Sequence, residues 1–125
     1  MKLRCTTNSI RIRIRKSDMR QLAETGSITE AIAFPIGNSF TFTLRVNDDI
    51  DALTAQYQAN DIAVHLPKST AEQWINSNDI SLEHHQTLHD GKTLHLLVEK
   101  DLPCLDRPEE DKSDTFEELD KGCHH

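Results

Sequence analysis

Aromatic residues, glycine, proline and cysteine are all scarce in this chain of 125 residues. It holds four phenylalanines, one tyrosine, one tryptophan, four glycines, four prolines and three cysteines, and hydrophobic residues make up 36%. That share predicts a small core. No apolar run approaches the roughly 18 residues of a membrane-spanning helix. We find no glycine-rich phosphate loop, nucleophile motif or C-x-x-C pair, and the length excludes a large enzyme with its own cofactor domain. Catalysis has no positive support, so we expect a non-enzymatic protein.

The first residues are charged where a secretory signal peptide would be apolar. Lys2 and Arg4 lie in that region, so we expect a cytoplasmic protein without membrane contact. The cysteines are odd in number, which favours reduced thiols over a disulfide framework. They are Cys5, Cys104 and Cys123.

Charge is distributed unevenly along the chain. The formal net charge is −7, with +3 in residues 1–50, −4 in residues 51–100 and −6 in residues 101–125. An acidic protein is a weak partner for phosphate backbones, because their affinity is largely electrostatic. The balance therefore disfavours nucleic acid and favours a protein partner.

The sequence resembles itself at an offset of 52 positions. Residues 8–47 align with residues 60–99 without a gap, and nine of the 40 positions are identical. Apolar residues also match, since Ile10, Ile12 and Ile14 correspond to Ile62, Val64 and Leu66. We interpret this pattern as an internal duplication.

Each copy has the pattern β-β-α-β-β. Strands are expected near residues 2–6 and 10–15, then a short helix and a hairpin, and the same elements recur from residue 53. Half a sheet of this size cannot bury its apolar face alone. We therefore predict a mainly β domain over residues 1–100, with repeats at about 2–47 and 53–99. The two copies would form a β-barrel or a tightly packed pair of sheets related by a pseudo-twofold axis, with two short helices. Such a pseudo-dimer would be a monomer or a homodimer.

Local signals predict how the helices and the second hairpin are bounded. Ser17 and Ser69 are expected as N-caps, with Ser69 and Glu72 in a capping box. Asp90-Gly91 is typical of a two-residue type I′ turn. That turn would place His95 opposite Gln86 and His84 opposite Leu97. His84 and His95 would then be diagonal neighbours, close enough to share a metal ion, although exposed histidines on a hairpin remain the simpler interpretation.

Two resemblances to known families follow from short motifs. Val64-His65-Leu66-Pro67-Lys68, Asn78-Asp79-Ile80-Ser81-Leu82-Glu83 and residues 90–96 together resemble the AbrB/MazE swapped-hairpin element. The resemblance implies a barrel of two interleaved copies, here within one chain. The whole chain is also similar to a small uncharacterised bacterial family, which implies no activity. The residues that carry this second likeness are Asn8-Ser9-Ile10-Arg11, Cys104-Leu105, Arg107, Glu110-Asp111 and Ser113-Asp114.

An arginine row is the strongest candidate for an anion-binding site. Arg11, Arg13 and Arg15 alternate with isoleucines, so a strand would place them on one face about 6.6–7 Å apart, with Arg4 joining from the neighbouring strand. Guanidinium groups suit phosphates and carboxylates. Three interpretations stay open: a solvated face, an anion or nucleic-acid site, and a landing surface for the acidic tail.

The acidic tail, residues 101–125, holds the candidate metal ligands. Cysteine and histidine are good ligands for zinc, copper or nickel. Alternatives are a Cys104–Cys123 disulfide, unpaired thiols, or terminal histidines that belong to an expression tag. We expect the tail to dock partly on the domain. The sequence thus predicts a small binding or accessory protein with a protein partner and a metal site in the tail. The competing function is an AbrB-like nucleic-acid regulator or antitoxin that uses the arginine row. The tail ligands concerned are Cys104, Cys123, His124 and His125.

Overall fold

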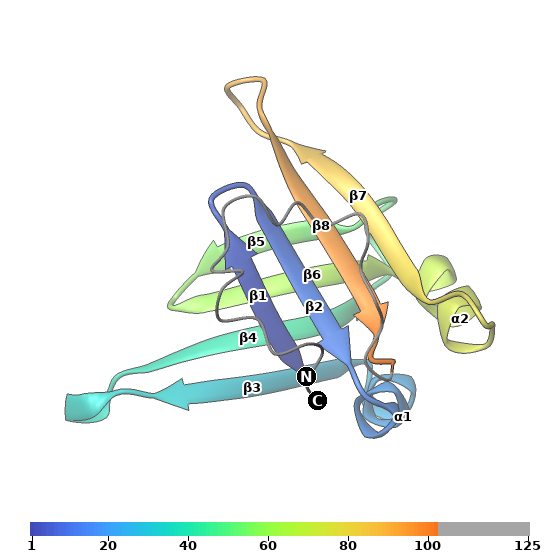
Figure 1. Cartoon of the computed structure of the whole chain (residues 1–125), viewed down its shortest axis with the longest axis horizontal. Helices are drawn as coiled ribbons and strands as arrows, with labels where there is room; N and C mark the ends of the chain where they lie inside the picture. Colours follow the sequence, from blue (N-terminus) through green and yellow to red (C-terminus); the bar gives the residue numbers. More distant parts are fainter. Residues whose placement is uncertain (103–125) are drawn as a thin grey trace, which may run out of the picture.

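The computed structural model describes residues 1–102, which form eight strands and two α-helices (Figure 1). The mainly β class is confirmed, and so is the order β-β-α-β-β, which occurs twice in the chain. In chain order the elements are β1 (Lys2–Thr6), β2 (Ser9–Ile14), α1 (Lys16–Thr25), β3 (Ser27–Ala33), the short 3-10 turn η1 (Pro35–Gly37), β4 (Ser39–Asn47), β5 (Thr54–Gln58), β6 (Asp61–Pro67), α2 (Lys68–Ile75), β7 (Ser81–Thr87) and β8 (Thr93–Lys100).

The two copies are interleaved. One sheet, called sheet A, has the order β1-β2-β8-β7, and the other, sheet B, has the order β3-β4-β6-β5. Each sheet thus combines a hairpin of one copy with a hairpin of the other, and each join is a parallel pair, β2 with β8 and β4 with β6. Neither copy can complete a sheet without the other, as expected for two halves that share one core.

The register shows that the repeat contains a two-residue insertion, so the alignment without a gap was wrong in its second half. The offset is 52 residues from β1 to β5, and the β1–β2 pairing is reproduced in β5–β6 at that offset. It is 54 from β3 to β7, and the β3–β4 pairing is reproduced in β7–β8. The insertion lies between α2 and β7, where the chain takes a longer path than between α1 and β3. Gly37 and Gly91, both at positive φ, are 54 residues apart.

The core lies between the sheets and consists of the inward side chains of both. Ile12 and Ile14 of β2 and their counterparts Val64 and Leu66 of β6 are at most 1% exposed. Trp74 of α2 is also buried, as the helical spacing predicts, and its indole N–H donates to the carbonyl of Ile80. The alternating strands therefore place apolar residues inward and polar residues outward.

The helices begin before the predicted caps. α1 begins at Lys16 after Arg15, and α2 begins at Lys68 after Pro67, so Ser17 and Ser69 lie inside their helices and are not N-caps. In α1 the carboxylate of Asp18 accepts the Arg15 backbone N–H at 2.9 Å. A residue three positions into the helix thus accepts the backbone N–H of the N-cap residue, which is a different donor from the one that a serine N-cap would satisfy.

The loop of the second hairpin is longer by one residue than predicted. The backbone N–H of Leu88 donates to the carbonyl of Lys92, which leaves His89, Asp90 and Gly91 as a three-residue loop. Thr87 then pairs with Thr93 and His85 with His95. The expected pairings of His95 with Gln86 and of His84 with Leu97 are therefore wrong by one position.

The sheets meet along one edge through a side chain. The Gln86 amide oxygen accepts the Ala55 N–H at 2.8 Å, and its amide nitrogen donates to the Ala55 carbonyl. This contact connects the edge strands β7 and β5. Within residues 1–102 no strand pairing joins sheet A to sheet B, so the arrangement is the packed pair of sheets. Neither α1 nor α2 is long and apolar enough to cross a membrane.

Candidate functional site

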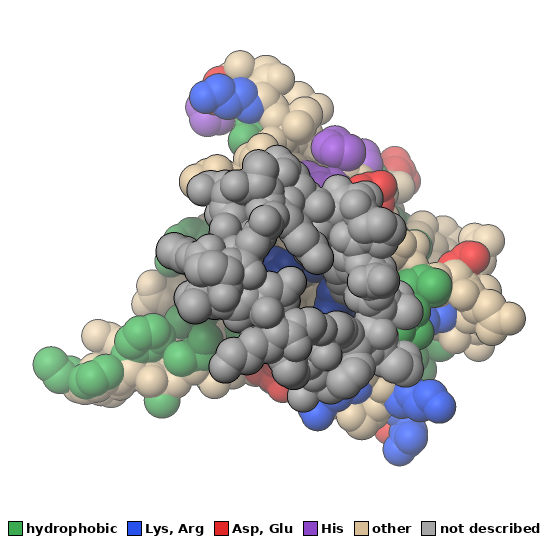
Figure 2. Space-filling model, in the orientation of Figure 1, with side chains coloured by type: hydrophobic (Ala, Val, Ile, Leu, Met, Phe, Trp, Pro, Cys, Tyr) green, Lys and Arg blue, Asp and Glu red, His purple; other side chains and the backbone are tan. Residues whose placement is uncertain are grey.

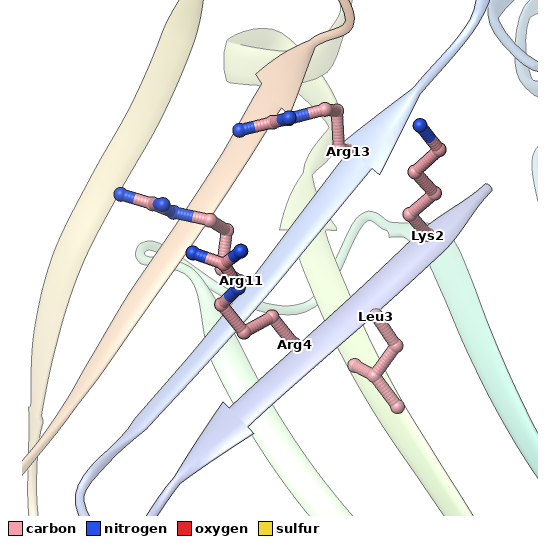
Figure 3. Close-up of a pocket in the computed structure, with 5 residues that line it drawn as sticks. All are labelled: Lys2, Leu3, Arg4, Arg11 and Arg13. Carbon is pink, nitrogen blue, oxygen red and sulfur yellow. The ribbon is translucent and has the colours of Figure 1, made fainter. Parts of the chain in front are cut away.

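Four cations gather on the outward side of strands β1 and β2. Lys2 lies opposite Arg13, and Arg4 lies opposite Arg11. These four residues, called the basic face, line a pocket together with Leu3, whose side chain points away from the cations (Figure 3). A neighbouring pocket shares Arg4 and Arg11 and extends to His95 on β8. Sequence analysis missed Lys2, although its period-two spacing from Arg4 was the signal available.

The basic face opposes like charges across a strand pair. Residues directly opposite in an antiparallel pair have Cβ atoms about 4.5–5.5 Å apart, and like charges there destabilise the pair. The basic face contains two such pairs in succession. Such pairs by themselves oppose folding, so nearby negative charge is needed to offset their repulsion.

One carboxylate is already bound at the edge of the basic face. Glu99 of β8 accepts hydrogen bonds from Arg13 Nε at 3.1 Å and Arg13 Nη2 at 2.9 Å, and its Oε1 lies 3.8 Å from Arg11 Nε. Lys2 Nζ lies 3.8 Å from Asp101. Arg4 has no ion-pair partner among residues 1–102. Carboxylates of this chain thus pair with Lys2, Arg11 and Arg13, and Arg4 is the member of the basic face without a described partner.

Arg15 does not belong to the row in which it was predicted. β2 ends at Ile14, whose carbonyl accepts the N–H of Asp101, and the chain then turns into α1. Arg15 becomes the residue before that helix, and its Nε lies 3.7 Å from Asp18. Period-two spacing holds only while a strand continues.

The hairpin histidines form a different cluster from the one expected. The rings of His85 and His95 stack with centroids 4.5 Å apart, and His95 Nε2 lies 2.5 Å from a carboxylate oxygen of Glu83. His84 pairs with Leu96 and has the register of the inward face. His84 and His95 therefore point to opposite sides of sheet A. Figure 2 shows histidine side chains at the surface in the region of β7 and β8.

The predicted metal ligands Cys104, Cys123, His124 and His125 lie outside the described residues, as does the expected docking of the tail. Within residues 1–102 no group of three His, Cys, Asp or Glu side chains is placed to hold a metal ion. The predicted zinc, copper or nickel site therefore stays a prediction.

The outward side of sheet B carries a polar network, in which His65 is the counterpart of Arg13. Asp61 accepts hydrogen bonds from the Thr41 and Thr43 hydroxyls at 2.5 and 3.0 Å. His65 is buried, and its Nδ1 lies 3.3 Å from the amide nitrogen of Asn47. Burial lowers the pKa of His65, the nearby charge of Arg45 lowers it further, and Asp61 opposes the shift. The folded chain therefore favours the neutral form of the His65 imidazole.

An apolar hairpin tip is the second feature that sequence analysis missed. Ile32, Phe34 and Ile36 at the end of the β3–β4 hairpin are 48%, 53% and 98% exposed. This hairpin projects from the molecule, and hydrophobic side chains gather at its tip (Figure 2). The available signal was a stretch without charge, residues 31–44, in a chain that is 28% charged.

Comparison with known proteins identifies a family. Residues 1–120 match the model of a family of unknown function (DUF7009), so the chain belongs to that family. No curated protein and no solved structure matches the chain. The expected membership of an uncharacterised family is confirmed. The AbrB/MazE resemblance stays a prediction, although the two interleaved copies that it implies are present in the fold.

Proposed function

We propose, for this member of a family without known function, that the chain is a non-enzymatic binding protein whose basic face holds a carboxylate-rich segment of a protein partner. One observation carries the proposal: two cross-strand pairs of like charge, Lys2 with Arg13 and Arg4 with Arg11, lie side by side on the outward side of sheet A. A bound anion would relieve the part of this repulsion that Glu99 and Asp101 do not offset, which concerns Arg4 above all.

The chemistry of the site favours carboxylates. Arginine presents a planar fork of donors that fits a carboxylate, and charge-assisted hydrogen bonds are the stronger kind. Within the chain, two donors of the Arg13 guanidinium converge on one carboxylate oxygen of Glu99. Along a strand, side chains on one face repeat about every 6.8 Å, and the acidic side chains of an extended peptide repeat at the same interval. An extended acidic segment lying along β1 and β2 therefore matches the spacing of the cations.

The lining of the site disfavours nucleic acid as the ligand. Residues 1–102 hold eleven basic and thirteen acidic residues, a balance that weakens long-range attraction for any polyanion, so the choice between peptide and nucleic acid depends on the side chains at the basic face. The two pockets on this face are lined by no Phe, Tyr or Trp among the described residues, and such side chains are the usual platforms for unpaired bases. The nucleic-acid regulator thus becomes an outcome of the test.

The test compares two probes on the full chain. Fluorescence anisotropy at about 50 mM salt would measure binding of a labelled polyglutamate peptide and of single-stranded and duplex DNA of similar length. We expect polyglutamate to bind more tightly than either DNA. Arg4→Gln with Arg11→Ala should weaken polyglutamate binding at least about tenfold, since a hydrogen bond to a charged group contributes about 1.5–3 kcal/mol. Gln56 and Ala63 occupy the equivalent positions of sheet B, so the substituted residues suit this backbone.

A matched control removes two cations elsewhere. Arg20→Gln with Lys68→Gln gives the same net charge, and both residues are exposed on helices. This variant should bind polyglutamate within about twofold of the parent chain, because screened charges away from the site act weakly. Equal loss in both variants would reduce the effect to net charge and contradict the proposal. Preference for DNA would establish the nucleic-acid function instead.

A further inference from the structure

The acidic tail leaves the described domain beside the basic face. β8 ends at Lys100, and the backbone N–H of Asp101 donates to the carbonyl of Ile14 at 2.7 Å. The carboxylate of Asp101 also lies 3.8 Å from Lys2 Nζ. Just before residue 103, the chain is thus hydrogen-bonded to the end of β2 and lies next to Lys2 of the basic face.

Charge along the chain is complementary to that face. Residues 103–125 hold eight acidic and three basic residues. Among residues 1–102, only Glu99 and Asp101 pair with the basic face, and Arg4 has no described partner. The segment with the largest excess of negative charge in the sequence therefore starts beside a face where four cations have two carboxylates as partners within residues 1–102.

The segment is long enough to follow both strands. β2 has six residues, which corresponds to about 20 Å at about 3.3 Å per residue. Glu109 and Glu110 lie eight and nine residues beyond Asp101, within an extended reach of about 26–30 Å. A tethered segment of this length has an effective concentration on the order of millimolar at a nearby site, so even weak contacts compete with a free ligand.

We infer that residues 103–125 bind the basic face of their own chain and restrict its access to an external acidic ligand. The inference rests on the proposed function, because it describes the regulation of that same site. A partner would have to displace the acidic tail, so modification or capture of the tail would increase binding at the basic face.

The experiment neutralises the tail in the full chain. Five substitutions, Glu109→Gln, Glu110→Gln, Asp111→Asn, Glu117→Gln and Glu118→Gln, should increase polyglutamate affinity about tenfold or more. The control neutralises five exposed carboxylates elsewhere and has the same net charge, so it should change affinity by less than about twofold. Its substitutions, each to asparagine, are at Asp48, Asp49, Asp51, Asp79 and Asp90.

A second measurement needs no probe. Backbone amide NMR shifts of β1 and β2 should change on tail neutralisation and stay constant in the control. Equal affinity gains in both variants, with constant shifts on β1 and β2, would overturn the inference and leave the proposed function in place. Shift changes on β1 and β2 without polyglutamate binding to any variant would overturn the proposed function and support the tail contact.

Discussion

The outward sides of the two sheets differ in chemistry although the sheets share one register. Arg4, Arg11 and Arg13 of sheet A are replaced in sheet B by Gln56, Ala63 and His65. The inward positions stay apolar in both, as Ile12 and Val64 illustrate. The inner positions of the repeat thus keep apolar residues in both sheets, whereas the outer positions differ in residue type between them. The basic face is therefore a property of one sheet and not of the fold.

The largest expected effect separates the inner from the outer side of one strand. Ile12→Ala should lower the free energy of unfolding by about 2–5 kcal/mol, because it leaves a cavity in the shared core. The neighbouring Arg11→Ala should change it by no more than about 0.5 kcal/mol, since that side chain faces outward. Urea unfolding followed by circular dichroism measures both. Similar losses in the two variants would contradict the assignment of faces.

A pH titration sharpens the comparison between Arg13 and its counterpart His65. The pKa of His65 is lowered by burial from the ordinary value of 6.5, so the unfolded chain takes up a proton at higher pH than the folded chain. Stability from this group is present above pH 6.5 and is lost as the pH falls through the lowered pKa. We expect the free energy of unfolding to decrease from pH 7.5 to pH 5.5.

His65→Gln should make that decrease smaller, and His89→Gln on the exposed loop should leave it as in the parent chain. The pKa of Asp18 is also lowered, from the ordinary 3.8, with hydrogen bonds and the nearby amino group outweighing burial. Its contribution is lost only in more acidic solution, so it does not interfere. An unchanged pH dependence in His65→Gln would rule out the buried imidazole as its source.

The smallest expected effect concerns the two hairpin tips. Ile36 has φ 67° and is 98% exposed, whereas the equivalent residue Asp90 has no positive φ. A β-branched residue at positive φ is strained, and this one gains no packing in return. Ile36→Asn should therefore raise the free energy of unfolding by up to about 1 kcal/mol, measured by urea unfolding. Asp90→Asn, the matched change, should stay within about 0.5 kcal/mol; a loss in Ile36→Asn would show that Ile36 packs in a way that the fold does not predict.

Local patterns predicted the strands and the class of fold, because alternation such as Ile10, Ile12 and Ile14 records which side chains are buried. They did not predict register. The loop at His89–Gly91 is one residue longer than predicted, and this shifts every cross-strand pair of the β7–β8 hairpin by one position. The partners predicted for His84 and His95 were therefore wrong. The parallel pairing of β2 with β8 joins residues 86 positions apart, which no local signal reports.

The candidate site was predicted only in part, because period-two spacing indicates which residues share a face but not where a strand ends. Arg4, Arg11 and Arg13 share a face because period-two spacing holds within β1 and β2. Arg15 fails because β2 ends at Ile14 and α1 begins at Lys16, so Arg15 is the residue at the start of the helix. The charge-free stretch of residues 31–44 was a signal for the apolar tip, but the positive φ and the exposure of Ile36 arise from the backbone of a loop, which composition does not encode.

The most direct test of the basic face is a residue-level map of ligand contact. Polyglutamate added to the isotope-labelled full chain should shift the backbone amides of β1 and β2 first and most, with those of β4 and β6 unchanged. Saturable shifts on sheet A that weaken with rising salt are the predicted result. Shifts centred on sheet B, or none at about 20 mM salt in the chain with the neutralised tail, would contradict the account.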